Sequence, residues 1–98
     1  MVSSKELQNE YIKMYTQLRN YIWGFDTVEK LANLEIEVYN SFPDIAKIQS
    51  TFNMLYQDVR HIFSEDDELA EAVASFKELI ESVDGDFYLK LDKVQEAI

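Results

Sequence analysis

The chain has 98 residues, of which 47% are hydrophobic and 29% are charged, and its formal net charge at pH 7 is −10. So large an apolar fraction excludes an intrinsically disordered chain. Its two glycines and one proline are too few for the closely spaced turns of an all-β domain. Because the chain has no cysteine, disulfides and thiolate chemistry are excluded as well. These values favour a single small helical domain over residues 1–98.

The first predicted helix begins after Ser3, because Glu6 completes a capping box three residues later. Gly24 is expected to end this helix in a left-handed conformation. Apolar residues at alternating steps of four and three predict the buried stripe: Leu7, Tyr11, Met14, Leu18, Tyr21 and Phe25.

The second predicted helix begins at a capping Asp26, and the third follows Pro43 with Ser41 as its expected cap. The inward stripe of the second helix is Val28, Leu31, Leu34, Val38 and Phe42. The third helix has the most regular pattern, with steps of three and four throughout: Ile45, Ile48, Phe52, Leu55, Val59 and Ile62.

A fourth predicted helix begins after Ser64 and ends at Gly85. Its stripe is Leu69, Val73, Phe76, Ile80 and Val83. A short fifth helix over residues 86–98 is predicted from Phe87, Leu91, Val94 and Ile98. Since short connections make consecutive helices antiparallel, the predicted fold is all-α: an antiparallel up-down four-helix bundle with a short fifth C-terminal helix.

Most of the negative charge lies in one part of the chain, because residues 64–86 hold nine acidic residues and one basic residue. Around the fourth helix, the side chains opposite the apolar stripe form a predicted anionic ridge: Asp67, Glu71, Glu78 and Glu81. Two interpretations of the ridge stay open. It is either a charged surface that keeps a small domain soluble, or a docking surface for a basic protein partner.

A second candidate partner-binding surface lies on the first helix, away from its buried stripe. Ile12, Arg19 and Trp23 line up there with Thr16, and Trp and Arg are enriched at binding hot spots. The alternative is that the C-terminal helix covers this surface. Ile36 and Met54 also lie off their stripes, and several such residues exposed together would indicate a homodimer.

No residue pattern points to catalysis, a metal or a cofactor. The one histidine, His61, lies three residues after Asp58, which is half of the carboxylate–histidine set of a di-iron bundle, and no second pair exists. The serines lie mostly at predicted caps, and the two glycines are too far apart for a phosphate-binding loop. We therefore expect a protein that is not an enzyme.

Nine basic residues against nineteen acidic ones argue against direct nucleic-acid binding, and the fourth helix has the wrong sign for a membrane surface. The first residues lack the apolar run of a signal peptide, so a cytoplasmic location is expected.

The expected function is that of a non-enzymatic interaction or regulatory module that binds a protein partner. The alternatives are a homo-oligomeric structural protein, an accessory or immunity-type inhibitor, or a DNA mimic. In size, acidity and helical class, the chain resembles accessory proteins of phages and mobile elements and bacteriocin immunity proteins. That resemblance covers no specific motif and assigns no site residue.

Overall fold

The computed structural model describes residues 3–82, which form four α-helices and one short 3₁₀ turn and contain no strand. The helices are α1 (Ser4–Leu18), α2 (Phe25–Val38), α3 (Ile45–Val59) and α4 (Asp67–Glu81), and the 3₁₀ turn is η1 (Arg60–Ile62). The predicted helix over residues 86–98, and the predicted end of the fourth helix at Gly85, lie outside the described residues.

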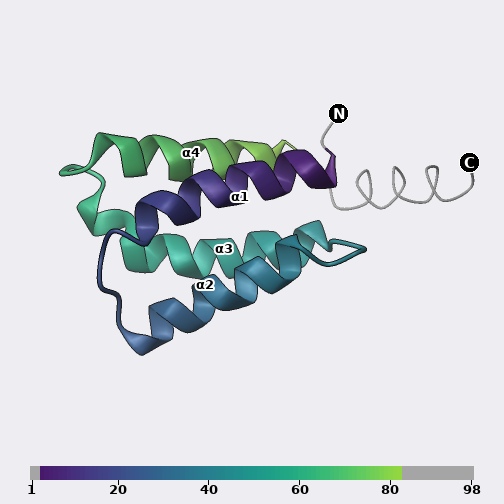
Figure 1. The fold of residues 1–98 in the computed structure, drawn as a ribbon, viewed down its shortest axis with the longest axis horizontal. Helices are drawn as coiled ribbons and strands as arrows, with labels where there is room; N and C mark the ends of the chain where they lie inside the picture. The colour runs from purple at the N-terminus through teal and green to yellow at the C-terminus, as the bar shows by residue number, and fades with distance from the viewer. Residues whose placement is uncertain (1–2, 83–98) are drawn as a thin grey trace, which may run out of the picture.

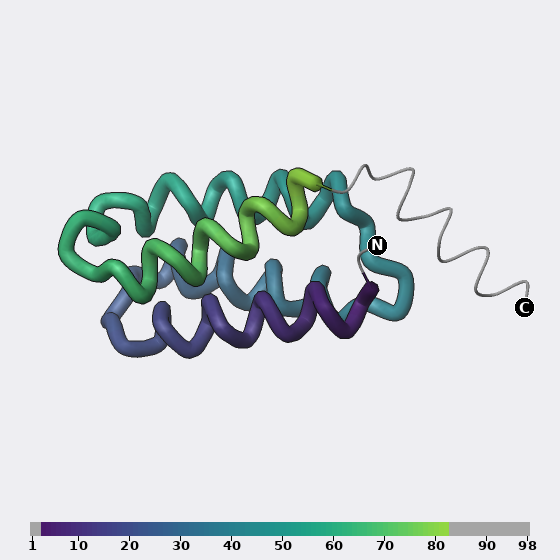
Figure 2. Tube along the Cα trace, turned by 90° about the horizontal axis from the view of Figure 1, so that it is seen from above, coloured from purple at the N-terminus to yellow at the C-terminus, as the bar shows by residue number. Residues whose placement is uncertain are grey.

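The four helices pack as two close pairs that form a helical bundle. Helix α1 lies beside α4, and α2 lies beside α3, while contacts between the two pairs are sparser. The segments 19–24 and 60–66 lie at one end of the bundle, and the segment 39–44 lies at the other (Figures 1 and 2).

The predicted stripes form most of the core. The buried hydrophobic residues are Leu7, Tyr11, Met14, Leu18, Leu31, Leu34, Val38, Ile45, Ile48, Phe52, Leu55, Val59, Ile62, Leu69, Val73, Phe76 and Ile80. Aromatic rings join the two helix pairs, since the centroid of Phe76 on α4 lies 5.3 Å from that of Phe52 on α3. Within the α1–α4 pair, the centroid of Phe76 lies 6.4 Å from that of Tyr11. The Tyr11 hydroxyl also donates a hydrogen bond to the Leu31 carbonyl oxygen at 3.3 Å.

The predicted end of the first helix is wrong, because α1 stops at Leu18. The indole Nε1 of Trp23 donates to the Leu18 carbonyl oxygen at 2.8 Å, and the backbone N–H of Tyr21 donates to the same oxygen at 3.1 Å, so the segment after α1 satisfies the last carbonyl of the helix. Gly24 is not in a left-handed conformation. It has a φ of −65° and is the N-cap of α2, which begins at Phe25.

Two further expected caps are also wrong. The side chain of Asp44, not Ser41, accepts from a backbone N–H of α3, that of Lys47. For α4, the cap is Asp66 and not Ser64, because the Asp66 carboxylate accepts from the Leu69 N–H. In both cases the aspartate directly precedes the first residue of the helix, and its carboxylate suits the positive end of the helix dipole.

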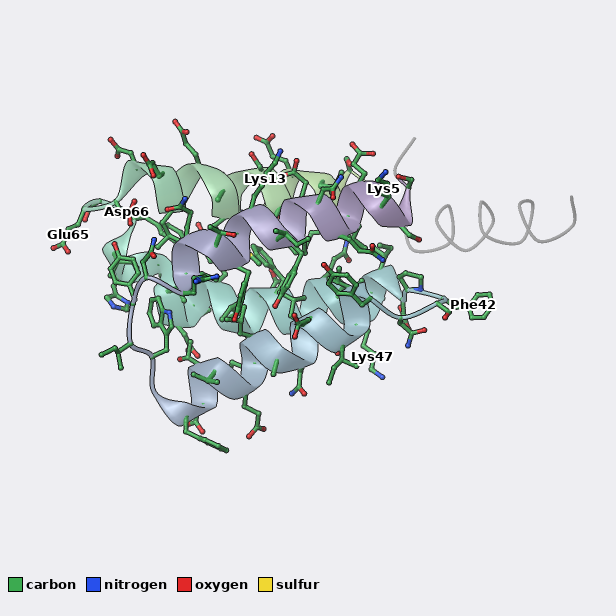
Figure 3. The ribbon with its side chains drawn as sticks, viewed as in Figure 1. Lys5, Lys13, Phe42, Lys47, Glu65 and Asp66 are labelled. Atoms are coloured by element: carbon green, nitrogen blue, oxygen red, sulfur yellow. The ribbon has the colours of Figure 1, made fainter. Side chains whose placement is uncertain are left out.

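Three residues of the predicted stripes lie outside the core. Phe25, Val28 and Phe42 are 77%, 49% and 61% exposed. Phe42 lies in the loop after α2 and projects beyond the end of the bundle (Figure 3). Because α2 ends at Val38, the helical spacing no longer applies at Phe42, and Pro43 is buried in its place.

Candidate functional site

The predicted anionic ridge lies on the outer side of α4. Asp67, Glu71, Glu78 and Glu81 are all exposed. Asp67 lies in the first turn of α4, where a carboxylate interacts favourably with the helix dipole. Glu81 lies 3.7 Å from the Lys77 ammonium nitrogen, so part of its charge is compensated. The ammonium of Lys77 also lies 5.2 Å from the centre of the Tyr56 ring.

The structure adds an acidic residue that the sequence pattern did not single out, because it belongs to another helix. Glu10 of α1 lines two shallow hollows between α1 and α4, of about 380 and 310 Å³. Glu78 lines the first hollow, and Glu68 and Glu71 line the second. We call Glu10, Glu68, Glu71 and Glu78 the acidic face. Small side chains, including Ser75, lie between these carboxylates and make the face concave.

One basic side chain borders the acidic face. The Lys13 ammonium lies 3.4 Å from Oε1 of Glu10, and Lys13 lines the second hollow together with Glu68 and Glu71. The other oxygen of Glu10, Oε2, is covered and has no hydrogen-bond partner. Within residues 3–82, neither Glu71 nor Glu78 forms an ion pair, so the face keeps a net negative charge.

Trp23 does not lie on the first helix, so the predicted helical line of Ile12, Arg19 and Trp23 is wrong. Trp23 belongs to the segment 19–24, is half-buried, and packs against the core. Its ring centroid lies 5.8 Å from that of Tyr21 and 6.2 Å from that of His61. Its indole N–H donates a hydrogen bond to the Leu18 carbonyl oxygen at the C-terminal end of α1, so part of its role is structural.

Arg19 and Trp23 nevertheless line one hollow, which lies between α1 and α2. This α1–α2 groove has a volume of about 260 Å³, and most of its lining is apolar or aromatic. It is lined by Tyr11, Tyr15, Arg19, Tyr21, Trp23, Val28, Leu31, Ala32 and Glu35. The sequence pattern could not show it, because it forms only when the loop brings Trp23 back beside α2.

The remaining apolar residues that were expected off the stripes are exposed. Ile12, Ile36 and Met54 are 48%, 67% and 50% exposed, and they lie on three different helices. Ile12 does not line the α1–α2 groove, whereas Ile36 borders a separate hollow next to Glu37.

Asp58 and His61 have separate surroundings. The Asp58 carboxylate accepts from the Lys30 ammonium at 2.7 Å and from the Thr27 hydroxyl at 3.0 Å. These donors, Lys30 first, lower the pKa of Asp58 below its ordinary value of 3.8. His61 lies in the 3₁₀ turn, with its ring edge-to-face with that of Trp23. Asp58 therefore links α2 to α3.

At the same end of the bundle, the Tyr21 hydroxyl donates to Oδ2 of Asp66. This hydrogen bond raises the pKa of Tyr21 and, together with the bond from the Leu69 N–H, lowers that of Asp66. Burial raises the pKa of Tyr11 well above its ordinary range, with Glu35 adding to the effect. The Tyr11 hydroxyl therefore stays neutral in the groove at any ordinary pH.

Over residues 3–82, no group of three or more histidine and carboxylate side chains is arranged to hold a metal ion. No helix in this range combines the length and the apolar character needed to cross a membrane. The described fold is thus an all-helical bundle with an acidic face on one side and an apolar groove on another. Comparisons with protein-family models, with curated proteins and with solved structures find no match.

Proposed function

We propose that this protein is a non-enzymatic interaction module whose acidic face binds a basic protein partner. In this proposal the four helices form an antiparallel up-down bundle, and the protein acts in the cytoplasm. The protein recognises its partner by electrostatic attraction. A cluster of carboxylates that keeps a net negative charge attracts a positive surface over roughly a Debye length, which raises the rate of encounter and selects the partner's charge.

The observation that supports this function is the convergence of carboxylates from two helices on one concave surface. Glu10 comes from α1 and Glu68, Glu71 and Glu78 from α4, along hollows whose other lining residues are mostly small or polar. A ridge on a single helix would present a convex row of charges to solvent. A shallow face built from two helices can instead present a lysine or arginine side chain with carboxylates from both, each of which can accept a charge-assisted hydrogen bond.

The test reverses two charges at the centre of the face, in the variant Glu71→Lys/Glu78→Lys. The matched control is Asp26→Lys/Glu29→Lys on α2, which makes the same change in net charge at exposed positions away from the face. Each protein is used to capture partners from lysate of the source organism at low and moderate salt, and the captured proteins are identified by mass spectrometry. The affinity of the purified partner for each protein is then measured.

The expected result is a basic partner that the parent and the control retain and that the face variant binds at least about tenfold more weakly, a loss of about 1.4 kcal/mol. Binding by the parent should also weaken as salt increases, because salt screens exposed charges. A partner bound equally by the face variant and the parent would contradict the proposal.

An inhibitor that imitates DNA would use this same face, with a DNA-binding protein as the basic partner. Direct competition between DNA and this protein for the captured partner identifies that case. The second candidate function is a homo-oligomeric structural protein, which the exposed apolar side chains Ile36 and Met54 favour. Sedimentation that stays monomeric at high concentration excludes it.

A further inference from the structure

The α1–α2 groove is lined by one basic and one acidic side chain, Arg19 and Glu35, which lie at its two ends. The Tyr11 hydroxyl reaches the Leu31 carbonyl oxygen, four residues before Glu35. The Tyr11 ring lies 6.2 Å from that of Tyr39, four residues after Glu35. Glu35 therefore lies at the Tyr11 end of the groove. Arg19 directly follows α1, about 12 Å further along that helix than Tyr11.

Both charged side chains of the groove are exposed, and the surface between them is mainly apolar. Over the part of the chain that the structure describes, neither Arg19 nor Glu35 takes part in an ion pair. Between them, Val28 is 49% exposed, Tyr15 is 39% exposed, and the small side chain of Ala32 is exposed as well. Apolar surface left open to water costs free energy in proportion to its area. The groove therefore suits a partner with an apolar middle and opposite charges at its two ends.

We propose that the occupant of the α1–α2 groove is the same groove of a second copy of this chain, in a two-fold symmetric dimer. In such a dimer each contact between the protomers occurs twice. A two-fold axis through the middle of the groove, near Tyr15 and Ala32, reverses one groove relative to the other. Arg19 of one protomer then faces the partner's Glu35 at each end. A second copy carries the complementary charges at the matching separation, because the separation is that of the groove itself.

The distribution of charge favours self-association on this side of the molecule. The net charge of −10 opposes contact between acidic surfaces, but the groove lining has one basic and one acidic residue, so its formal charge is zero. With 3.6 residues per turn, Glu10, Lys13 and Gln17, which line the second hollow of the acidic face, lie on the opposite side of α1 from Tyr11 and Tyr15. The dimer therefore leaves the acidic face open and does not rest on the function proposed for that face.

The test exchanges the two charges. The variants are Arg19→Glu, Glu35→Arg and the double variant Arg19→Glu/Glu35→Arg. The control is Lys47→Glu, which makes the same change in net charge as Arg19→Glu at an exposed position on α3. Sedimentation of the full-length proteins over a range of concentrations measures the dissociation constant of each dimer, and circular dichroism verifies that each variant is folded. The two single variants are also mixed in equal amounts, and native mass spectrometry identifies the mixed dimer by its mass.

The expected result is a dimer of similar affinity in the parent, the control and the double variant. Each single variant should raise the dissociation constant at least about tenfold, because like charges then meet at both ends of the interface. Mixing the two single variants should restore a dimer that contains one copy of each, because each variant supplies the charge that the other lacks. Restoration between two chains distinguishes pairing across the interface from pairing within one chain.

Three results would overturn the proposal. A parent that stays monomeric at high concentration leaves the groove to a different protein. A dimer that both single variants form as tightly as the parent places the contact on another surface, such as that of Ile36 or Met54. Single variants that are folded and stay monomeric when mixed exclude the reciprocal pairing of Arg19 with the partner's Glu35.

Discussion

At the scale of single residues, the strongest polar link between helices is the one that Asp58 makes. Its carboxylate, on α3, accepts from Lys30 and Thr27 on α2, and the lysine nitrogen lies only 2.7 Å away. The side chains of Lys30 and Asp58 are 29% and 28% exposed, so water screens the pair less than it screens a fully exposed one. We expect Asp58→Asn to lower the free energy of unfolding by about 1 kcal/mol.

The effect of Asp58 should depend on pH in a defined direction. Its pKa in the folded protein lies below the ordinary value of 3.8, so the unfolded chain binds the proton more tightly. The stabilisation is therefore fully present above about pH 5 and is lost as pH falls from 3.8 through the folded-state pKa. Urea titrations of the parent and of Asp58→Asn at pH 7 and pH 3 measure this. A difference in stability that is the same at both pH values would contradict the assignment.

At the scale of helices, Asp66 fixes where α4 begins. Its carboxylate caps the helix through the Leu69 N–H and also accepts from the Tyr21 hydroxyl, so it joins α4 to the loop that follows α1. We expect Asp66→Ala to lower the urea midpoint of unfolding. Ser64→Ala, at the residue that the sequence pattern suggested as the cap, should leave it nearly unchanged. Equal effects of the two substitutions would contradict this account of the cap.

The helices and the buried stripes of α3 and α4 could be predicted from sequence, because burial follows helical spacing as long as the helix continues. The stripe residues from Ile45 to Val59 in α3, Ile62 in η1, and those from Leu69 to Ile80 in α4 are buried as the spacing requires. Helix ends were harder to predict. After α1 the chain turns so that the indole of Trp23, five residues beyond Leu18, donates to the Leu18 carbonyl oxygen, and the helical spacing of the apolar residues does not encode this contact.

Prediction of the candidate surfaces from the sequence meets the same limit. The exposure of the four ridge carboxylates follows from their positions on α4, so their spacing was enough to predict it. The contribution of Glu10 depends on which helix packs beside α4, and the α1–α2 groove depends on the path of the loop 19–24. Both are properties of tertiary packing, which periodicity in one helix does not specify.

At the scale of the whole molecule, the two helix pairs depend on one another through a few aromatic side chains. Phe76 of α4 is fully buried and contacts both Phe52 of α3 and Tyr11 of α1. Tyr11 in turn reaches the Leu31 carbonyl oxygen of α2. Because contacts between the pairs are otherwise sparse, these rings should make the bundle unfold as a single cooperative unit.

We therefore expect Phe76→Ala to lower the free energy of unfolding by about 3–5 kcal/mol, since it leaves a large cavity where the two pairs meet. Phe25→Ala is the control, because Phe25 is 77% exposed and its loss should change stability by less than about 0.5 kcal/mol. Urea unfolding is followed by circular dichroism, which reports all helices, and by fluorescence of Trp23, the one tryptophan. Coincident transitions in the parent would agree with a single cooperative unit. An early transition in Trp23 fluorescence with helicity retained would instead mean that the α1–α2 end opens separately, and the aromatic contacts would then not govern the stability of the bundle.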